Sequence, residues 1–252
     1  MENTNTLVSD QKNSILIPVE TIQTEINYLE TVKAFGRLAF NSIYIFDYIE
    51  NRMVYISDNR IFLHDSKVGE VFEKSENYFQ KYIKQEDQTI VAQAQKAGFE
   101  FYAQVPESKR KEYVLMYDFH LIDENQNTLL IHHKLTPLSL TQEGKIAKVM
   151  CTITMASNTT AGNIMMSKDN SNMIWKYDPK TEKWTESTKI IVSKRELQIL
   201  GYYKQGLTIN EISDKLCLSS DTIKFHRRKL FQKMNVRTIN QALTYATRYQ
   251  LI

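Results

Sequence analysis

The spacing of apolar residues near the start of the chain predicts one amphipathic helix. Four apolar residues recur at helical spacing after Pro18, namely Ile22, Ile26, Leu29 and Val32. This stripe predicts a helix over residues 18–41, whose apolar side packs on its own domain or on a partner chain. The polar residues 1–17 before it are expected to be a disordered N-terminus.

Alternation of apolar residues then predicts an antiparallel sheet with helices in the middle of its sequence. The strand candidates are Ser42–Asp47, Arg52–Ser57, Glu112–Ile122, Thr128–Leu138 and Lys145–Ala156. Helical patterns lie between them, at Tyr78–Ile83 and from Asp87 through Ala103. Turns are expected at residues 123–127 and 141–144. Two strands, helices and three strands predict an α+β domain over residues 42–157.

Residues 158–190 are predicted to be a linker with a small hairpin. Ser157–Ser171 is rich in Ser, Thr, Asn and Gly, which indicates a flexible connection. The stretch from Met173 to Thr185 contains a Pro-containing turn and predicts the hairpin. Its two tryptophans, Trp175 and Trp184, are expected to pack against one of the flanking domains, with no preference for either.

Helix-start patterns recur at short intervals near the end of the chain. Ser193–Glu196 and Thr208–Glu211 each have the form of a capping box, in which side chains satisfy backbone N–H groups at a helix start. Ser219 and Thr238 are expected to cap two further helices, and Gly206 stands where the first helix needs a left-handed residue. Four short helices predict an all-α helix-turn-helix domain over residues 191–252.

The third of these helices has an apolar side and a basic side. On a helical wheel the apolar side holds Ile223, His226, Leu230 and Met234, and the other side holds Lys224, Phe225, Arg228, Lys229 and Gln232. Cations can contact phosphates, a guanidinium can bind guanine, and an exposed ring can touch a thymine methyl. Arg227 lies toward the apolar side and is expected to extend its head group to a phosphate. A basic face is often merely solvated, but the exposed Phe favours DNA binding.

The charge distribution supports this interpretation. From Ser193 onward the chain has eleven Lys and Arg and four Asp and Glu, which gives a net charge of +7. Because the whole chain has a net charge of +3, the residues before Ser193 have a net charge of −4. Such asymmetry is typical of a polyanion-binding tail.

These C-terminal residues resemble the LuxR-type (GerE-like) helix-turn-helix of bacterial transcription regulators. The similarity lies in Ser193–Glu196, Gly206–Ile212 and Ser219–His226. The resemblance implies a set of DNA-binding residues, in which Lys224, Phe225 and Arg228 face bases and Ser219, Thr222 and Lys233 approach phosphates, with Thr208, Arg227 and Lys229 completing the interface. It also implies that the fourth helix serves dimerisation. Lys229 and Asn235 depart from the family pattern, which commonly has Asn and Gly at these positions.

The order of elements in the front domain resembles the PAS sensory fold. Ile83–Asp87 also resembles the acidic helix start of that fold. The resemblance implies a sensor or dimerisation module, often with a central pocket. Tyr113, Tyr117 and Phe119 alternate along one strand face and either line a cavity or fill the core, and a cavity would take a small apolar or aromatic ligand.

The histidines and cysteines do not predict a metal, haem or other cofactor. His120, His132 and His133 lie on neighbouring strand candidates, but hairpin geometry places His120 opposite Leu130, so neither of the others falls directly across from it. The two cysteines, Cys151 and Cys217, have no metal-ligand or disulfide spacing and are interpreted as small buried hydrophobes.

Other function classes lack the residues that they need. No P-loop, dinucleotide fingerprint, G-x-S-x-G or zinc motif occurs, so an enzyme is not expected. A receiver domain needs clustered acids for Mg²⁺, and Asp47 stands alone. The remaining alternative is an initiation-factor-like protein that acts with RNA polymerase through a similar helix-turn-helix. It would need an additional basic, aromatic helical region, which the acidic front part does not offer.

The sequence therefore predicts a PAS-like sheet domain followed by a helix-turn-helix, acting on double-stranded DNA as a homodimer. No apolar run approaches the roughly 20 residues that cross a bilayer, and the start of the chain has no secretory pattern. We expect a cytoplasmic protein that has no membrane contact.

Overall fold

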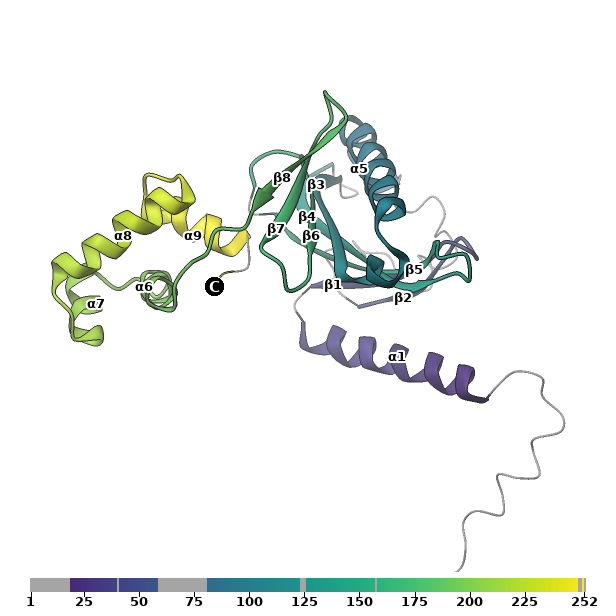
Figure 1. Cartoon of the computed structure of the whole chain (residues 1–252), viewed down its shortest axis with the longest axis horizontal. Coiled ribbons are helices and arrows are strands. Elements are labelled where there is room, and N and C mark those ends of the chain that lie inside the picture. Colours follow the sequence, from purple (N-terminus) through teal and green to yellow (C-terminus); the bar gives the residue numbers. More distant parts are fainter. Residues whose placement is uncertain are drawn as a thin grey trace, which may run out of the picture.

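The computed structural model describes residues 19–39, 41–58, 81–122, 126–156, 158–248 and 251, with side chains of the first helix described from Tyr28 onward. The predicted disordered residues 1–17 and the first half of the helical stretch predicted at 78–83, residues 78–80, lie outside this part. The described chain forms an antiparallel sheet with helices, followed by four helices that form a separate unit (Figure 1). This confirms the predicted α+β class with an all-α C-terminal domain.

The sheet has eight antiparallel strands in the order β2-β1-β5-β4-β3-β6-β7-β8. The strands are β1 (Ser42–Asp47), β2 (Arg52–Ile56), β3 (Tyr113–Ile122), β4 (Thr128–Leu140), β5 (Ile146–Met155), β6 (Gly162–Lys168), β7 (Met173–Asp178) and β8 (Lys183–Thr188). All five strands predicted in the front domain are present. His120 pairs with Leu130, as hairpin geometry predicts.

Strand β6 corrects the interpretation of residues 158–190 as a linker. It pairs with β3, with Val114 opposite Ser167 and Leu115 opposite Met166, where a flexible connection was expected. The reason is that its short apolar centre is buried, with Ile164 and Met166 only 2% and 0% exposed. Polar turn residues on both sides concealed this centre in the sequence. The predicted hairpin is present as β7 and β8, and β6 joins it to the sheet.

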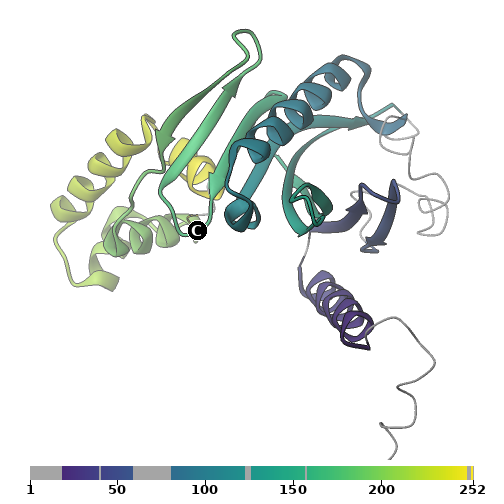
Figure 2. The same cartoon turned by 45° about the vertical axis from the view of Figure 1, so that its right-hand side comes forward.

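Two helices lie against opposite faces of the sheet (Figures 1 and 2). Helix α5 (Gln85–Gln104) packs on the face that carries Tyr44, whereas helix α1 (Val19–Leu38) packs on Ile43, because successive residues of β1 point to opposite faces. Leu29 and Val32 of α1 contact this second face, so the described part of the predicted stripe packs on its own domain. A short 3₁₀ helix, η1 (Glu107–Glu112), joins α5 to β3.

Close approach of α5 to β3 depends on a glycine. A Cβ atom added at Gly98 would lie 2.4 Å from Cδ2 of Leu115, a fully buried side chain of β3. Nearby, the ring of Phe101 lies 5.3 Å from that of Trp175 and 5.1 Å from that of Trp184. Both tryptophans therefore pack on the sheet domain, a choice that the sequence left open.

The three histidines on neighbouring strands of the sheet have separate partners. Nδ1 of His120 lies 2.7 Å from a carboxylate oxygen of Asp87, and Nδ1 of His132 lies 2.6 Å from one of Asp118. His133 is hydrogen-bonded to Tyr44. Among the described residues, no three His, Cys, Asp or Glu side chains gather as metal ligands.

The four C-terminal helices have the caps that the sequence predicts. They are α6 (Lys194–Lys204), α7 (Ile209–Leu216), α8 (Ser220–Met234) and α9 (Ile239–Arg248). The capping boxes at Ser193 and Thr208 are complete, and Gly206 has a φ of +83° after α6. No helix in the described part of the chain has the length and hydropathy that a membrane span requires.

Candidate nucleic-acid interface

Helices α7 and α8 are joined by a tight turn that both helix ends stabilise. Cys217 takes the left-handed conformation at φ 50°, and the next residue, Leu218, donates its N–H to the carbonyl of Ser213 at 2.9 Å. This is the pattern of a Schellman cap. Cys217 is exposed in this turn, so its interpretation as a buried hydrophobe was wrong, whereas Cys151 is buried as expected.

Small polar side chains fix α7 against the start of α8. The hydroxyl of Ser220 donates to the side-chain oxygen of Asn210 at 3.0 Å. The hydroxyl of Ser213 donates to the backbone carbonyl of Asn210 at 2.7 Å and lies 3.4 Å from that of Ser220. These bonds hold the two helices at one angle, because hydrogen bonds restrict both distance and direction.

One side of α8 is anchored in apolar clusters. Ile223 packs with Ile199 and Ile212, and all three side chains are 0% exposed. Farther along, Leu230 and Met234 pack with Leu200 and with Ala242 of α9. His226 is half-buried on this side, with its ring edge-on to Phe225 at a centroid distance of 5.7 Å. The inner side predicted from the helical wheel is therefore confirmed, and its contacts determine which side of α8 faces outward.

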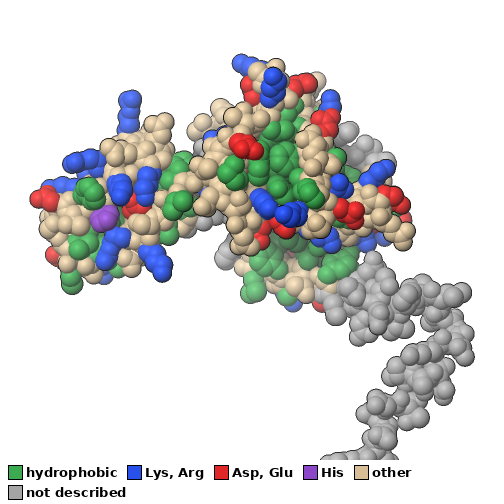
Figure 3. All heavy atoms as spheres, in the orientation of Figure 1, with side chains coloured by type: hydrophobic (Ala, Val, Ile, Leu, Met, Phe, Trp, Pro, Cys, Tyr) green, Lys and Arg blue, Asp and Glu red, His purple; other side chains and the backbone are tan. Residues whose placement is uncertain are grey.

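The outer side of α8 presents cations around an exposed aromatic ring. Lys224, Arg228 and Lys229 are exposed, and Phe225 is 56% exposed. The ammonium of Lys224 lies 3.0 Å from Asp221, one turn earlier, but such exposed pairs contribute less than about 1 kcal/mol. A phosphate or base can therefore replace Asp221 at little cost. Figure 3 shows Lys and Arg side chains spread over this helical unit, at the left of the view.

Three further predicted residues lie at the edges of this face. Arg227 is half-buried, and its guanidinium carbon lies 5.9 Å from the ring centre of Phe231. The hydroxyl of Ser219 accepts the N–H of Thr222 at 3.1 Å and lies 2.8 Å from the hydroxyl of Thr222. Both hydroxyls thus stand at the start of α8, where backbone N–H groups also favour an anion.

Thr208 serves first as a helix cap. Its hydroxyl donates to the carboxylate of Glu211 at 2.7 Å, and its backbone N–H donates to the same carboxylate at 2.8 Å. The bond from the backbone N–H of Thr208, together with the bond from its hydroxyl, holds the pKa of Glu211 below its usual value. The carboxylate is therefore charged at neutral pH beside Thr208, in a unit whose net charge is positive.

Lys233 has an internal partner that the sequence did not predict. Its ammonium lies 2.7 Å from the carboxylate of Glu196 and 3.0 Å from the backbone carbonyl of Ile191. Burial acts to raise the pKa of Glu196, but bonds from Lys233 and Ser193 lower it below its usual value. The resemblance implied that Lys233 approaches phosphate, whereas the structure uses its ammonium to tie α8 to the start of α6. The partners are 37 residues apart, so local sequence could not pair them.

The profile of a family described as bacterial regulatory proteins, luxR family, matches residues 191–246. Residues 191–246 are a LuxR-type helix-turn-helix domain. In this domain α8 occupies the position of the recognition helix, and α7 is the helix before it.

Sequence relatives match the chain within the same domain. The chain is 39% identical over 66 residues to the Fimbriae Z protein of Escherichia coli (strain K12), covering 26% of the chain and 31% of that protein. It is 36% identical over 62 residues to the oxygen regulatory protein NreC of Staphylococcus carnosus, covering 25% of the chain and 29% of that protein. The chain thus spans less than a third of the length of each of these relatives.

A solved structure aligns with more of the chain but with low similarity. The phage VqmA–DPO complex covers 91% of this chain and 90% of its own, at 14% identity and a TM-score of 0.35.

Proposed function

We propose that the protein is a sequence-specific DNA-binding transcription regulator whose helix α8 enters the major groove. The observation that carries this proposal is the exposed set of Lys224, Phe225, Arg228 and Lys229 on a helix anchored along its other side. A helix that binds in the major groove needs an inner side that is fixed to its own domain and an outer side that presents polar and cationic groups to the DNA.

The exposed side chains divide by the chemistry that each can contact. The guanidinium of Arg228 is suited to a bidentate contact with guanine, and the ring of Phe225 to a thymine methyl. Lys224 faces the same base edges. We assign Ser219, Thr222, Arg227 and Lys229 to phosphates, with Thr208 at the border of the interface. Because the ammonium of Lys233 is already bound to Glu196, we assign it a supporting role instead.

We further propose that two chains bind together. A dimer would place two copies of α8 in successive major grooves about 34 Å apart, so its preferred site would contain two related half-sites. Helix α9 lies beside α8 and is our candidate for the contact between chains. Light scattering of the full chain at micromolar concentration should give the mass of a dimer, and a monomeric mass there would oppose this part of the proposal.

The sheet domain is proposed to be a PAS-like sensory domain that controls DNA binding. Supporting this, its first five strands have the order β2-β1-β5-β4-β3, with α5 across one face. Strands β6 to β8 then continue this sheet beyond β3. The sensory unit therefore comprises residues 42–188 in this proposal, rather than ending at 157.

Selection from a random pool of DNA duplexes tests the proposal. The full chain should enrich a motif with two half-sites about 10 base pairs apart. In gel shifts on that motif, Arg228→Ala should weaken binding by about 1–3 kcal/mol and relax the preference at one base position of each half-site. Lys96→Ala, which removes an exposed cation from α5, is the matched control and should bind as the wild type does. Failure to enrich any motif would contradict the proposal.

A further inference from the structure

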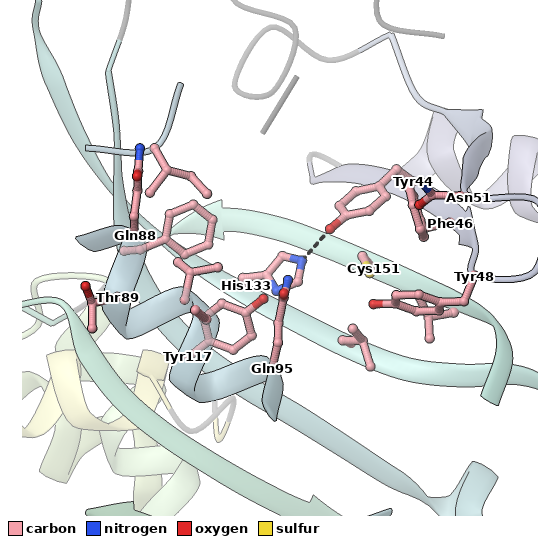
Figure 4. Close-up of a pocket in the computed structure, with 16 residues that line it drawn as sticks. Tyr44, Phe46, Tyr48, Asn51, Gln88, Thr89, Gln95, Tyr117, His133 and Cys151 are labelled. Carbon is pink, nitrogen blue, oxygen red and sulfur yellow. Dashed lines mark hydrogen bonds between the residues drawn. The ribbon is translucent and has the colours of Figure 1, made fainter. Parts of the chain in front are cut away.

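A cavity of about 630 Å³ lies between α5 and the sheet face that it covers. Figure 4 shows side chains from α5 and from strands β1, β3, β4 and β5 around it. Cavities of about 300–1,000 Å³ are typical of small-molecule sites. Of the aromatic residues predicted to line a cavity or fill the core, Tyr117 and Phe119 line this one, whereas Tyr113 packs beside Trp175.

The cavity is aromatic at its base and polar at its mouth. Tyr117 and Phe119 in its wall are only 1% and 2% exposed. The α5 side chains of Gln88, Thr89 and Gln95, which also line it, are exposed. A ring system can therefore be buried against the aromatic wall while its polar group lies near the amide and hydroxyl side chains at the mouth.

The described lining contains no charged side chain at neutral pH. It includes no Lys, Arg, Asp or Glu. Burial lowers the pKa of His133 to about 3, and burial raises the pKa of the Cys151 thiol to about 12 even though a hydrogen bond from Tyr44 acts to lower it. Both groups are therefore neutral. A charged ligand entering this cavity would lose its hydration without gaining a counter-ion from these residues.

One buried nitrogen of the lining has an unused hydrogen-bonding capacity. The hydroxyl of Tyr44 lies 2.8 Å from Nε2 of His133, but within the described part of the chain Nδ1 of the same ring has no hydrogen-bond partner. The ring is only 2% exposed, so leaving Nδ1 unpaired is unfavourable. A polar group on a bound molecule could supply the missing bond.

We propose that this cavity binds an uncharged ring compound that carries a neutral hydrogen-bonding group. The ring would pack against Tyr117 and Phe119, and the polar group would bond at His133 or at the glutamines of the mouth. This proposal rests on the proposed function only where it takes the bound molecule to be the signal that controls DNA binding. Binding of the molecule itself can be tested without DNA.

Two probes with the same ring system separate charge from shape. We would titrate the full chain with 2-naphthol and with naphthalene-2-sulfonate in a calorimeter at pH 7. The neutral 2-naphthol should bind at least tenfold more tightly than the sulfonate. Equal affinities, or no heat from 2-naphthol at concentrations up to its solubility limit, would overturn the proposal.

Substitutions on α5 test whether binding occurs in this cavity. Ala92 lines the cavity, so Ala92→Trp should fill part of it and weaken 2-naphthol binding at least tenfold. Ala103 is an exposed alanine of the same helix outside the lining, and Ala103→Trp should change the affinity by less than twofold. Unchanged binding by Ala92→Trp, or equal weakening by both variants, would exclude this location. Gel shifts with the wild type and no probe test the DNA-binding proposal separately, so the two proposals can fail independently.

Discussion

The neutral state of His133 has a consequence for the pH dependence of stability. In the unfolded chain its imidazole takes up a proton near its ordinary pKa of 6.5, whereas burial lowers the pKa in the folded protein to about 3. Below pH 6.5 the unfolded state therefore binds more protons than the folded state, so the free energy of unfolding decreases as the pH is lowered. The contribution of His133 is fully present above pH 6.5 and is progressively lost down to about pH 3.

The magnitude follows from these two pKa values. Between pH 7.0 and pH 5.5 the unfolded imidazole becomes mostly protonated, while the folded ring takes up almost no proton. The free energy of unfolding should fall by about 1 kcal/mol through this group alone. His133→Gln keeps a neutral polar side chain but cannot titrate, so the variant should lose about 1 kcal/mol less than the wild type over the same interval.

Urea unfolding followed by tryptophan fluorescence can measure this difference. The chain has two tryptophans, Trp175 and Trp184, and both pack on the sheet domain, so their emission reports on the domain that contains His133. The wild type and His133→Gln would each be unfolded at pH 7.0 and at pH 5.5. Equal losses of stability in the two proteins would refute the reasoning, because other titrating groups are common to both.

Two further predictions concern packing and the Lys233 ion pair. Gly98→Ala should destabilise the protein by about 1–3 kcal/mol in urea unfolding, since its Cβ meets buried Leu115. Gly201→Ala in α6, whose Cβ meets nothing within 4 Å, should instead stabilise it by up to about 1 kcal/mol. A more stable Gly98→Ala variant or a less stable Gly201→Ala variant would contradict this. Glu196→Gln should cost about 1–3 kcal/mol, because it leaves the Lys233 ammonium without its carboxylate. Urea unfolding followed by circular dichroism at 222 nm measures this loss of stability. If the losses caused by Glu196→Gln and Lys233→Met simply add in the double variant, the two residues are not coupled.

Local patterns predicted the C-terminal domain well because its helices begin and end on short-range contacts. The capping boxes at Ser193 and Thr208 join residues three positions apart, and the left-handed caps at Gly206 and Asn235 each depend on one residue. The inner side of α8 followed from helical periodicity alone. Lys233 could not be assigned in this way, because its carboxylate partner comes from another helix.

The sheet domain was predicted in outline, but its extension and its cavity were not. Polar composition concealed β6, whose strand character depends on burial of Ile164 and Met166 beside β3. The alternation of Tyr117 and Phe119 placed both on one face but could not distinguish a filled core from a cavity. That outcome depends on how far α5 stands from the sheet along its length, which is a property of tertiary packing.

Salt-dependent DNA binding tests the central claim most directly. We would measure the dissociation constant of the full chain for its selected duplex by fluorescence anisotropy at several KCl concentrations between 50 and 200 mM. The account predicts that affinity falls at least tenfold across this range, and that Lys229→Ala binds more weakly with a shallower dependence on salt, since one phosphate contact per half-site is lost. An affinity that is independent of salt, or a wild-type salt dependence in Lys229→Ala combined with full binding by Arg228→Ala, would contradict the assignment of α8 to DNA.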